Sequence, residues 1–75
     1  MDDIIYKVGR FCSNFRVNNL NMSLTDFCNY QNLNIKNVSA FEHGRANNIK
    51  YLYYYYNISD EANRRKFAIG LFKLI

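Results

Sequence analysis

The side chains of this 75-residue chain that could do chemistry are mainly lysine, arginine and asparagine. Several of them follow one another closely at Arg45, Asn47, Asn48 and Lys50. Lysine and arginine neutralise phosphate charge, and asparagine forms hydrogen bonds with phosphate oxygens. The pattern therefore favours a contact with a phosphate backbone, and an ordinary polar loop is the alternative.

Catalysis and metal binding lack the residues that they need. His43 is the only histidine, and no cluster of cysteine, histidine or carboxylate residues at ligand spacing surrounds it in the sequence. No nucleophile and base stand in a recognisable motif, and no glycine-rich phosphate loop is present. Cys12 and Cys28 fall at apolar helix positions without a CxxC spacing, which favours reduced core thiols. We therefore expect no enzyme activity, no metal and no cofactor.

Length and charge restrict the class of protein further. A chain of 75 residues predicts a single domain, residues 1–75. A net charge of +4 and a pI of about 9.2 favour an anionic partner without proving one. No signal peptide and no membrane-spanning run is evident, so we expect a cytoplasmic protein without a membrane partner.

Apolar residues recur at helical spacing along the whole chain, and the predicted fold class is all-α. Proline is absent, and no hairpin turn signal occurs. Ser23, Asn34 and either Ser59 or Asp60 are typical residues for the start of a helix. Asn32 suits a left-handed turn, and Gly44 suits a helix end. The predicted helices cover about 2–18, 24–30, 35–43, 47–56 and 60 onward.

Each predicted helix has an apolar face that we expect to point inward. These faces comprise Ile4, Ile5, Val8, Phe11, Cys12 and Phe15; Phe27 and Cys28; Val38 and Phe41; Ile49, Leu52, Tyr53 and Tyr56; and Phe67, Ala68, Leu71, Phe72 and Ile75.

A series of short motifs extends from the first predicted helix to the end of the third. It comprises Val8-Gly9-Arg10-Phe11, Phe15-Arg16, Ser23, Phe27-Cys28, Asn32-Leu33-Asn34, Val38-Ser39 and Phe41-Glu42-His43-Gly44-Arg45. In order and spacing, residues 8–58 resemble the Cro/C1-type (lambda-repressor-like) helix-turn-helix family. The resemblance implies a compact five-helix bundle that places the helix at about 35–43 in the major groove of DNA.

The resemblance also implies roles for individual residues. Base-facing positions are Ile35, Lys36, Asn37, Ala40 and His43; phosphate-facing positions are Ser23, Thr25, Arg45, Asn47 and Lys50. Asparagine pairs with adenine, lysine favours guanine, and isoleucine or alanine can contact thymine methyl groups. The alternatives are that Lys36 and Asn37 are only solvated and that Ser23 is only a helix cap. A structural ion pair between Arg16 and Glu42 is implied as well.

The tyrosine tract 51–56 and the apolar C-terminal residues exceed what one small core easily buries. We expect a homodimer interface that includes Tyr54, Tyr55, Leu71, Phe72 and Ile75. The alternative is a core face with the remaining tyrosines exposed. The basic cluster Arg64-Arg65-Lys66 is either solvated or in contact with phosphate, and the sequence does not rank these.

The first interpretation is a small bacterial or phage transcription regulator, repressor-like, that binds double-stranded operator DNA as a dimer and is nucleoid-associated when bound. The rival is a helix-turn-helix scaffold used as a protein-binding module, such as a phage-encoded inhibitor, an antirepressor or an accessory subunit. The rival is favoured by Ile35 and Ala40, which replace residues that are often polar in the family. An antitoxin with both roles is a third class.

Overall fold

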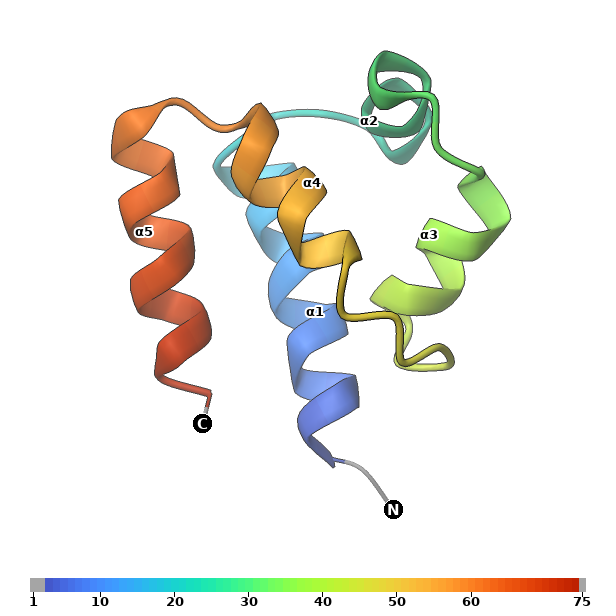
Figure 1. Cartoon of the computed structure of the whole chain (residues 1–75), viewed down its shortest axis with the longest axis horizontal. Coiled ribbons are helices and arrows are strands. Elements are labelled where there is room, and N and C mark those ends of the chain that lie inside the picture. Colours follow the sequence, from blue (N-terminus) through green and yellow to red (C-terminus); the bar gives the residue numbers. More distant parts are fainter. Residues whose placement is uncertain (1–2, 75) are drawn as a thin grey trace.

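The computed structural model describes residues 3–74, which fold into helices joined by short loops, without a strand in that range (Figure 1). The elements are α1 (Asp3–Asn18), α2 (Leu24–Gln31), α3 (Ile35–Glu42), α4 (Tyr51–Ile58) and α5 (Glu61–Phe72). α1 packs against α3, α4 and α5, and in Figure 1 α3 and α5 lie on opposite sides of it. The predicted all-α fold with five helices is confirmed.

Short polar side chains begin three of the helices, as predicted. The side-chain oxygens of Ser23, Asn34 and Asp60 each accept a hydrogen bond from the backbone N–H three residues later, at 3.0, 3.1 and 2.9 Å. Asn32 adopts the predicted left-handed conformation, with φ 58° and ψ 49°. Asn32 ends α2 and Asn34 begins α3, so the connection between the two helices has only three residues.

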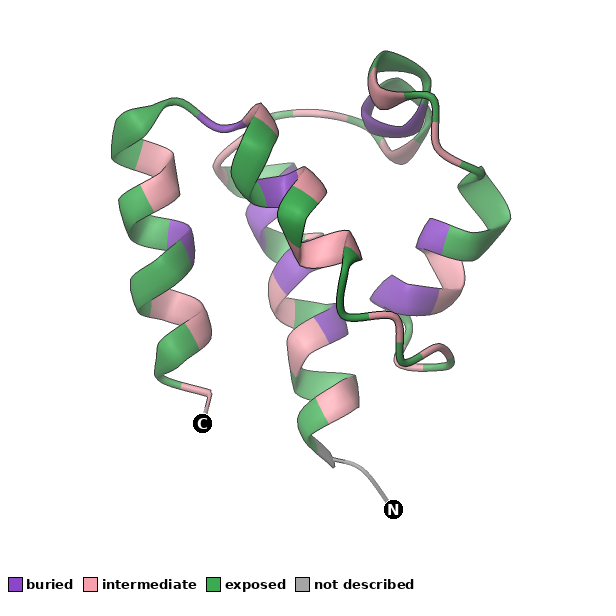
Figure 2. Ribbon diagram, in the orientation of Figure 1, coloured by how far each residue is buried: buried purple, intermediate pink, exposed green. Residues whose placement is uncertain are grey.

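All five helices contribute side chains to one core (Figure 2). The buried apolar residues are Cys12, Phe15, Phe27, Cys28, Val38, Phe41, Tyr55 and Phe67. The ring of Phe67 in α5 lies 4.9 Å from that of Phe15 and is nearly parallel to that of Tyr55, with centroids 6.1 Å apart. Large rings let a short chain bury much apolar area with few residues.

α4 differs from its prediction in both start and orientation. It begins at Tyr51 rather than near residue 47, because residues 44–50 form a loop. Ile49 is 72% exposed, and Tyr53 and Tyr56 are exposed as well, so their predicted inward positions were wrong. The inward residue is Tyr55, which is completely buried. Its hydroxyl has a hydrogen-bond acceptor inside the protein, as described below.

α5 buries a narrower face than predicted. Phe67 lies in the core, but Ala68 and Phe72 are exposed. Ile75 lies outside the described residues. At the start of α1, Ile4 is 40% exposed and stands at the edge of the core rather than within it.

α1 and α3 approach each other most closely at Gly9. A Cβ atom at this position would lie 2.4 Å from the backbone oxygen of Phe41 and 2.9 Å from that of Glu42. Both distances are far shorter than the contact distance of carbon and oxygen, so any side chain would push the two backbones apart. Gly9 is therefore required by the packing of α1 on α3.

We expect Gly9→Ala to destabilise the protein by about 1–3 kcal/mol through overpacking. A loss of stability would point to overpacking, because helix propensity alone favours alanine over glycine by about 1 kcal/mol. Urea unfolding followed by circular dichroism measures the change. Gly70→Ala is a matched control: its nearest neighbour is the ring of Phe11, at 2.5 Å, which is a side chain rather than backbone, so the loss should be smaller. A Gly9→Ala variant as stable as the parent would contradict the argument.

Candidate nucleic-acid interface

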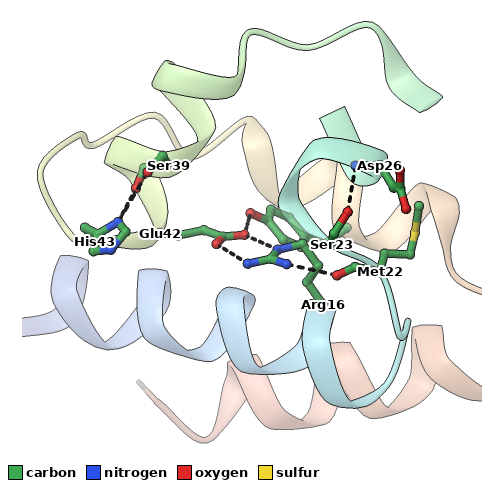
Figure 3. A network of polar contacts seen from close by, with 8 residues as sticks. Arg16, Met22, Ser23, Asp26, Ser39, Glu42 and His43 are labelled. Carbon is green, nitrogen blue, oxygen red and sulfur yellow. Dashed lines mark hydrogen bonds and ion pairs between the residues drawn. The ribbon is translucent and has the colours of Figure 1, made fainter. Parts of the chain in front are cut away.

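A buried ion pair joins α1 to the end of α3 (Figure 3). The guanidinium of Arg16 donates from Nε to Oε2 of Glu42 and from Nη2 to Oε1, both at 2.9 Å. Its remaining Nη1 donates to the carbonyl oxygen of Met22 at 2.9 Å, just before α2. The pair that the resemblance implied is present, and it is bidentate, the arrangement with the strongest geometric specificity.

The hydroxyl of Tyr55 completes this network. It donates to Oε2 of Glu42 at 2.6 Å and so connects α4 to the same carboxylate. Burial, together with the charge of Glu42 and this hydrogen bond, raises the pKa of Tyr55 far above its ordinary value. The hydrogen bond to Glu42 also raises the pKa of Arg16, against the opposing effect of burial. Arg16 therefore stays charged, and Tyr55 remains a donor.

This network fixes α3 on its inner side and leaves the opposite side free. Val38, Phe41 and Glu42 are buried, and they share one side of the helix. Lys36 is exposed and Ala40 is half-buried on the outer side, and Ile35, the first residue of the helix, is 42% exposed. The scaffold thus presents a rigid helix face to solvent.

A shallow hollow lies on this outer face, between α3 and the start of α2. Leu24, Ile35, Lys36, Ser39, Ala40 and Arg45 line it. It brings together three of the predicted base-facing residues and one of the predicted phosphate-facing residues. Leu24 and Ser39 were not among the predicted site residues; Leu24 also packs against the core, on the same side of α2 as Phe27 and Cys28.

The other predicted site residues stand outside the hollow. Asn37 and Lys50 are exposed but do not line it. His43 is exposed, and its Nδ1 lies 2.7 Å from the carbonyl oxygen of Ser39, so this nitrogen donates back to its own helix (Figure 3). Asn47 lines a separate apolar hollow between the start of α1 and the 44–50 loop.

Ser23 and Thr25 are both exposed at the beginning of α2. The hydroxyl of Ser23 accepts the capping hydrogen bond described above, which is the alternative that the sequence left open for it. The cap occupies one lone pair of the oxygen and leaves the hydroxyl hydrogen free to donate to a phosphate.

The two charged side chains that line the hollow, Lys36 and Arg45, are both positive. Lys36, Arg45 and Lys50 are exposed, and none of them pairs with a carboxylate within residues 3–74. Between residues 20 and 58 the acidic residues are Asp26, which is exposed, and Glu42, which Arg16 neutralises. The outer face of α3 therefore carries a net positive charge.

The predicted tyrosine interface needs a correction. Tyr55 is completely buried and cannot contact a partner, because its ring fills the core and its hydroxyl is bound to Glu42. Tyr54 and Leu71 are half-buried against the core. Phe72, by contrast, is 79% exposed.

Arg64 has a role that the sequence did not suggest. Its guanidinium donates to the carbonyl oxygens of Tyr56 and Asn57, both at 3.0 Å, and it lies over the Tyr56 ring. Arg64 therefore caps the C-terminal end of α4, where carbonyl groups lack helical partners. Lys66 remains exposed, and Arg65 makes a long, exposed contact with Glu61 at 4.0 Å.

Residues 3–74 contain no group of three or more histidine, cysteine or carboxylate residues placed to hold a metal ion. Cys12 and Cys28 are buried free thiols, and burial, with the charge of Glu42, raises the pKa of Cys12. A protonated, buried thiol is chemically inert. No helix within residues 3–74 is both long enough and apolar enough to cross a membrane.

Comparisons with known protein families, curated protein sequences and solved structures find no match for this chain.

We expect Glu42→Ala to destabilise the protein by about 3–5 kcal/mol, because it leaves the charge of Arg16 buried without a partner. Thermal and urea unfolding measure the loss. The double variant Arg16→Met/Glu42→Leu, which removes both charges, should lose less stability than the losses of Arg16→Met alone and Glu42→Leu alone added together. Arg65→Ala, which breaks the exposed contact with Glu61, is the control and should stay within about 0.5 kcal/mol. If the changes in unfolding free energy of the two single variants add up to that of the double variant, the network is not coupled.

Proposed function

We propose that this protein is a small DNA-binding transcription regulator of bacterial or phage type, which reads the major groove with α3. It acts by binding an operator and occluding a promoter, without catalysis or a cofactor. α2 and α3 act as the helix-turn-helix in this proposal, which the resemblance of residues 8–58 to the lambda-repressor-like family supports. Such a protein resides in the cytoplasm and on the nucleoid.

One observation carries the proposal: α3 is held rigidly on its inner side and is exposed and positively charged on its outer side. Lys36 and Arg45 lie at the hollow, and Lys50 follows in the loop. Cations spaced along one face fit the regularly spaced phosphates of DNA. The sequence resemblance supports the same helix.

Dimerisation belongs to the proposal because two symmetric half-sites about 34 Å apart double the contact area with DNA. Tyr55 is buried and takes no part in the interface, whereas Phe72, another of the predicted interface residues, is exposed. Ile69 and Phe72 are three residues apart on α5 and are 53% and 79% exposed, which supports this helix as the dimer contact.

We expect Phe72→Ser to weaken the dimer while leaving the helical content unchanged, because the ring contributes little to the core of one protomer. Sedimentation equilibrium measures the association. Tyr53→Ser is the matched control, since this ring is also exposed (60%) but lies on α4. A parent protein that is monomeric at all concentrations, or a Phe72→Ser variant that associates normally, argues against this interface.

A protein-binding module is the second candidate function. A hollow lined by Tyr30, Gln31, Tyr54, Asn57 and Ile58 favours it, since tyrosine is enriched at protein interfaces. This hollow lies on α2 and α4, separate from the cationic face of α3. Variants of the two faces therefore distinguish the two functions.

We expect the parent protein to select a preferred duplex from a random-sequence DNA pool and to bind it with an affinity that falls steeply as salt rises. Lys36→Ala and Arg45→Ala should each weaken binding and reduce the slope of log K against log salt by about one unit. Fluorescence anisotropy at several salt concentrations measures both quantities.

Lys66→Ala is the matched control for this experiment. It removes the same charge from an exposed position of α5, on the other side of α1 from α3 (Figure 1), so it should leave the salt slope unchanged. Weak binding that all three variants alter equally would refute the DNA-binding proposal. Variants of Tyr30 and Tyr54 would then be the first to test for loss of a protein partner.

A further inference from the structure

We infer that the hollow on α3 recognises thymine methyl groups, so that the operator half-site presents thymine to α2 and α3; this rests on the proposed DNA binding. The hollow combines apolar side chains with flanking cations. Leu24, Ile35 and Ala40 supply the apolar surface, and Lys36 and Arg45 supply the charge. Two helices contribute to it, so its shape is set by the fold rather than by one flexible side chain.

Apolar side chains have one natural counterpart in the major groove. The edges of the base pairs display hydrogen-bond donors and acceptors, and the C5-methyl of thymine is their apolar group. Ile35 and Ala40 cannot form side-chain hydrogen bonds, and burying polar base edges against them would leave those edges unsatisfied. The hollow therefore discriminates in favour of a methyl group and against an exposed donor or acceptor.

The polar groups near the hollow are less suited to reading bases. The hydroxyl of Ser39 lies 3.5 Å from Nδ1 of His43, beside the hydrogen bond that this nitrogen makes with the Ser39 carbonyl. Arg45 lies beyond the end of α3, and Lys36 has a long, flexible side chain that reaches phosphate readily. These cations hold the backbone, while the apolar side chains between them contact the base edge.

The test replaces single thymines by uracil, which removes only the methyl group. The duplex selected by the parent protein is synthesised with one substitution at a time, and affinity is measured by fluorescence anisotropy. A methyl group buried in the hollow predicts a loss of about fourfold at that position. Uracil elsewhere in the duplex should have no effect.

Protein variants assign the effect to the hollow. Ile35→Ala should bind the thymine and uracil duplexes almost equally, with an unchanged salt slope. Ile4→Ala is the matched control, because Ile4 has a similar exposure, 40% against 42%, and lies on α1. Circular dichroism checks that each variant is folded, and Leu24→Ala provides a second change on the opposite wall.

The outcomes separate the inference from the proposed function. Specific, salt-dependent DNA binding without a uracil effect at any position overturns the thymine-methyl inference and leaves the proposed function standing. A uracil effect that Ile35→Ala and Leu24→Ala both leave intact overturns the assignment to this hollow. Absence of salt-dependent DNA binding overturns the proposed function itself, and the inference with it.

Discussion

The carboxylate of Glu42 is the point on which the rest of the structure depends. Removing a charge from water is costly, and a buried ion pair is tolerated only when its hydrogen-bonding capacity is satisfied. Arg16 satisfies both carboxylate oxygens, and Tyr55 adds a third donor. Since the third guanidinium nitrogen bonds to the Met22 carbonyl, the network joins α1, the segment before α2, α3 and α4. A shift of any one of these elements would leave a buried polar group without its partner.

The aromatic core extends this constraint to the fifth helix. Tyr55 stacks on Phe67, and Phe67 also contacts Phe15, so α5 is positioned through the same tyrosine that bonds to Glu42. A chain of this length buries a modest share of its surface, and rings supply the area efficiently. Tyr55 therefore both forms a hydrogen bond with the buried ion pair and fills the apolar core. This explains why Tyr55, rather than a neighbouring tyrosine, faces inward.

Local signals made α1 to α3 predictable and left α4 ambiguous. Ser23, Asn34 and Asp60 can cap helices by themselves, and Asn32 tolerates the left-handed conformation without tertiary help. Four consecutive tyrosines, by contrast, present the same side chain on every side of a helix, so periodicity cannot set the orientation. That orientation depends on a distant acceptor, Glu42 (13 residues before Tyr55), which no local pattern reveals.

The candidate site shows the same division between local and tertiary information. Ile35, Lys36 and Ala40 were identified from the sequence through the helix-turn-helix resemblance, which assigns positions within a single helix. Leu24 joins them because α2 crosses beside α3, and that proximity follows from the three-residue turn and the shared core. A single apolar side chain on an exposed helix face is ordinary. Several of them in a hollow flanked by cations form a surface with a defined shape and charge. The chemical character of the site therefore arises from the packing of two helices rather than from the composition of either one.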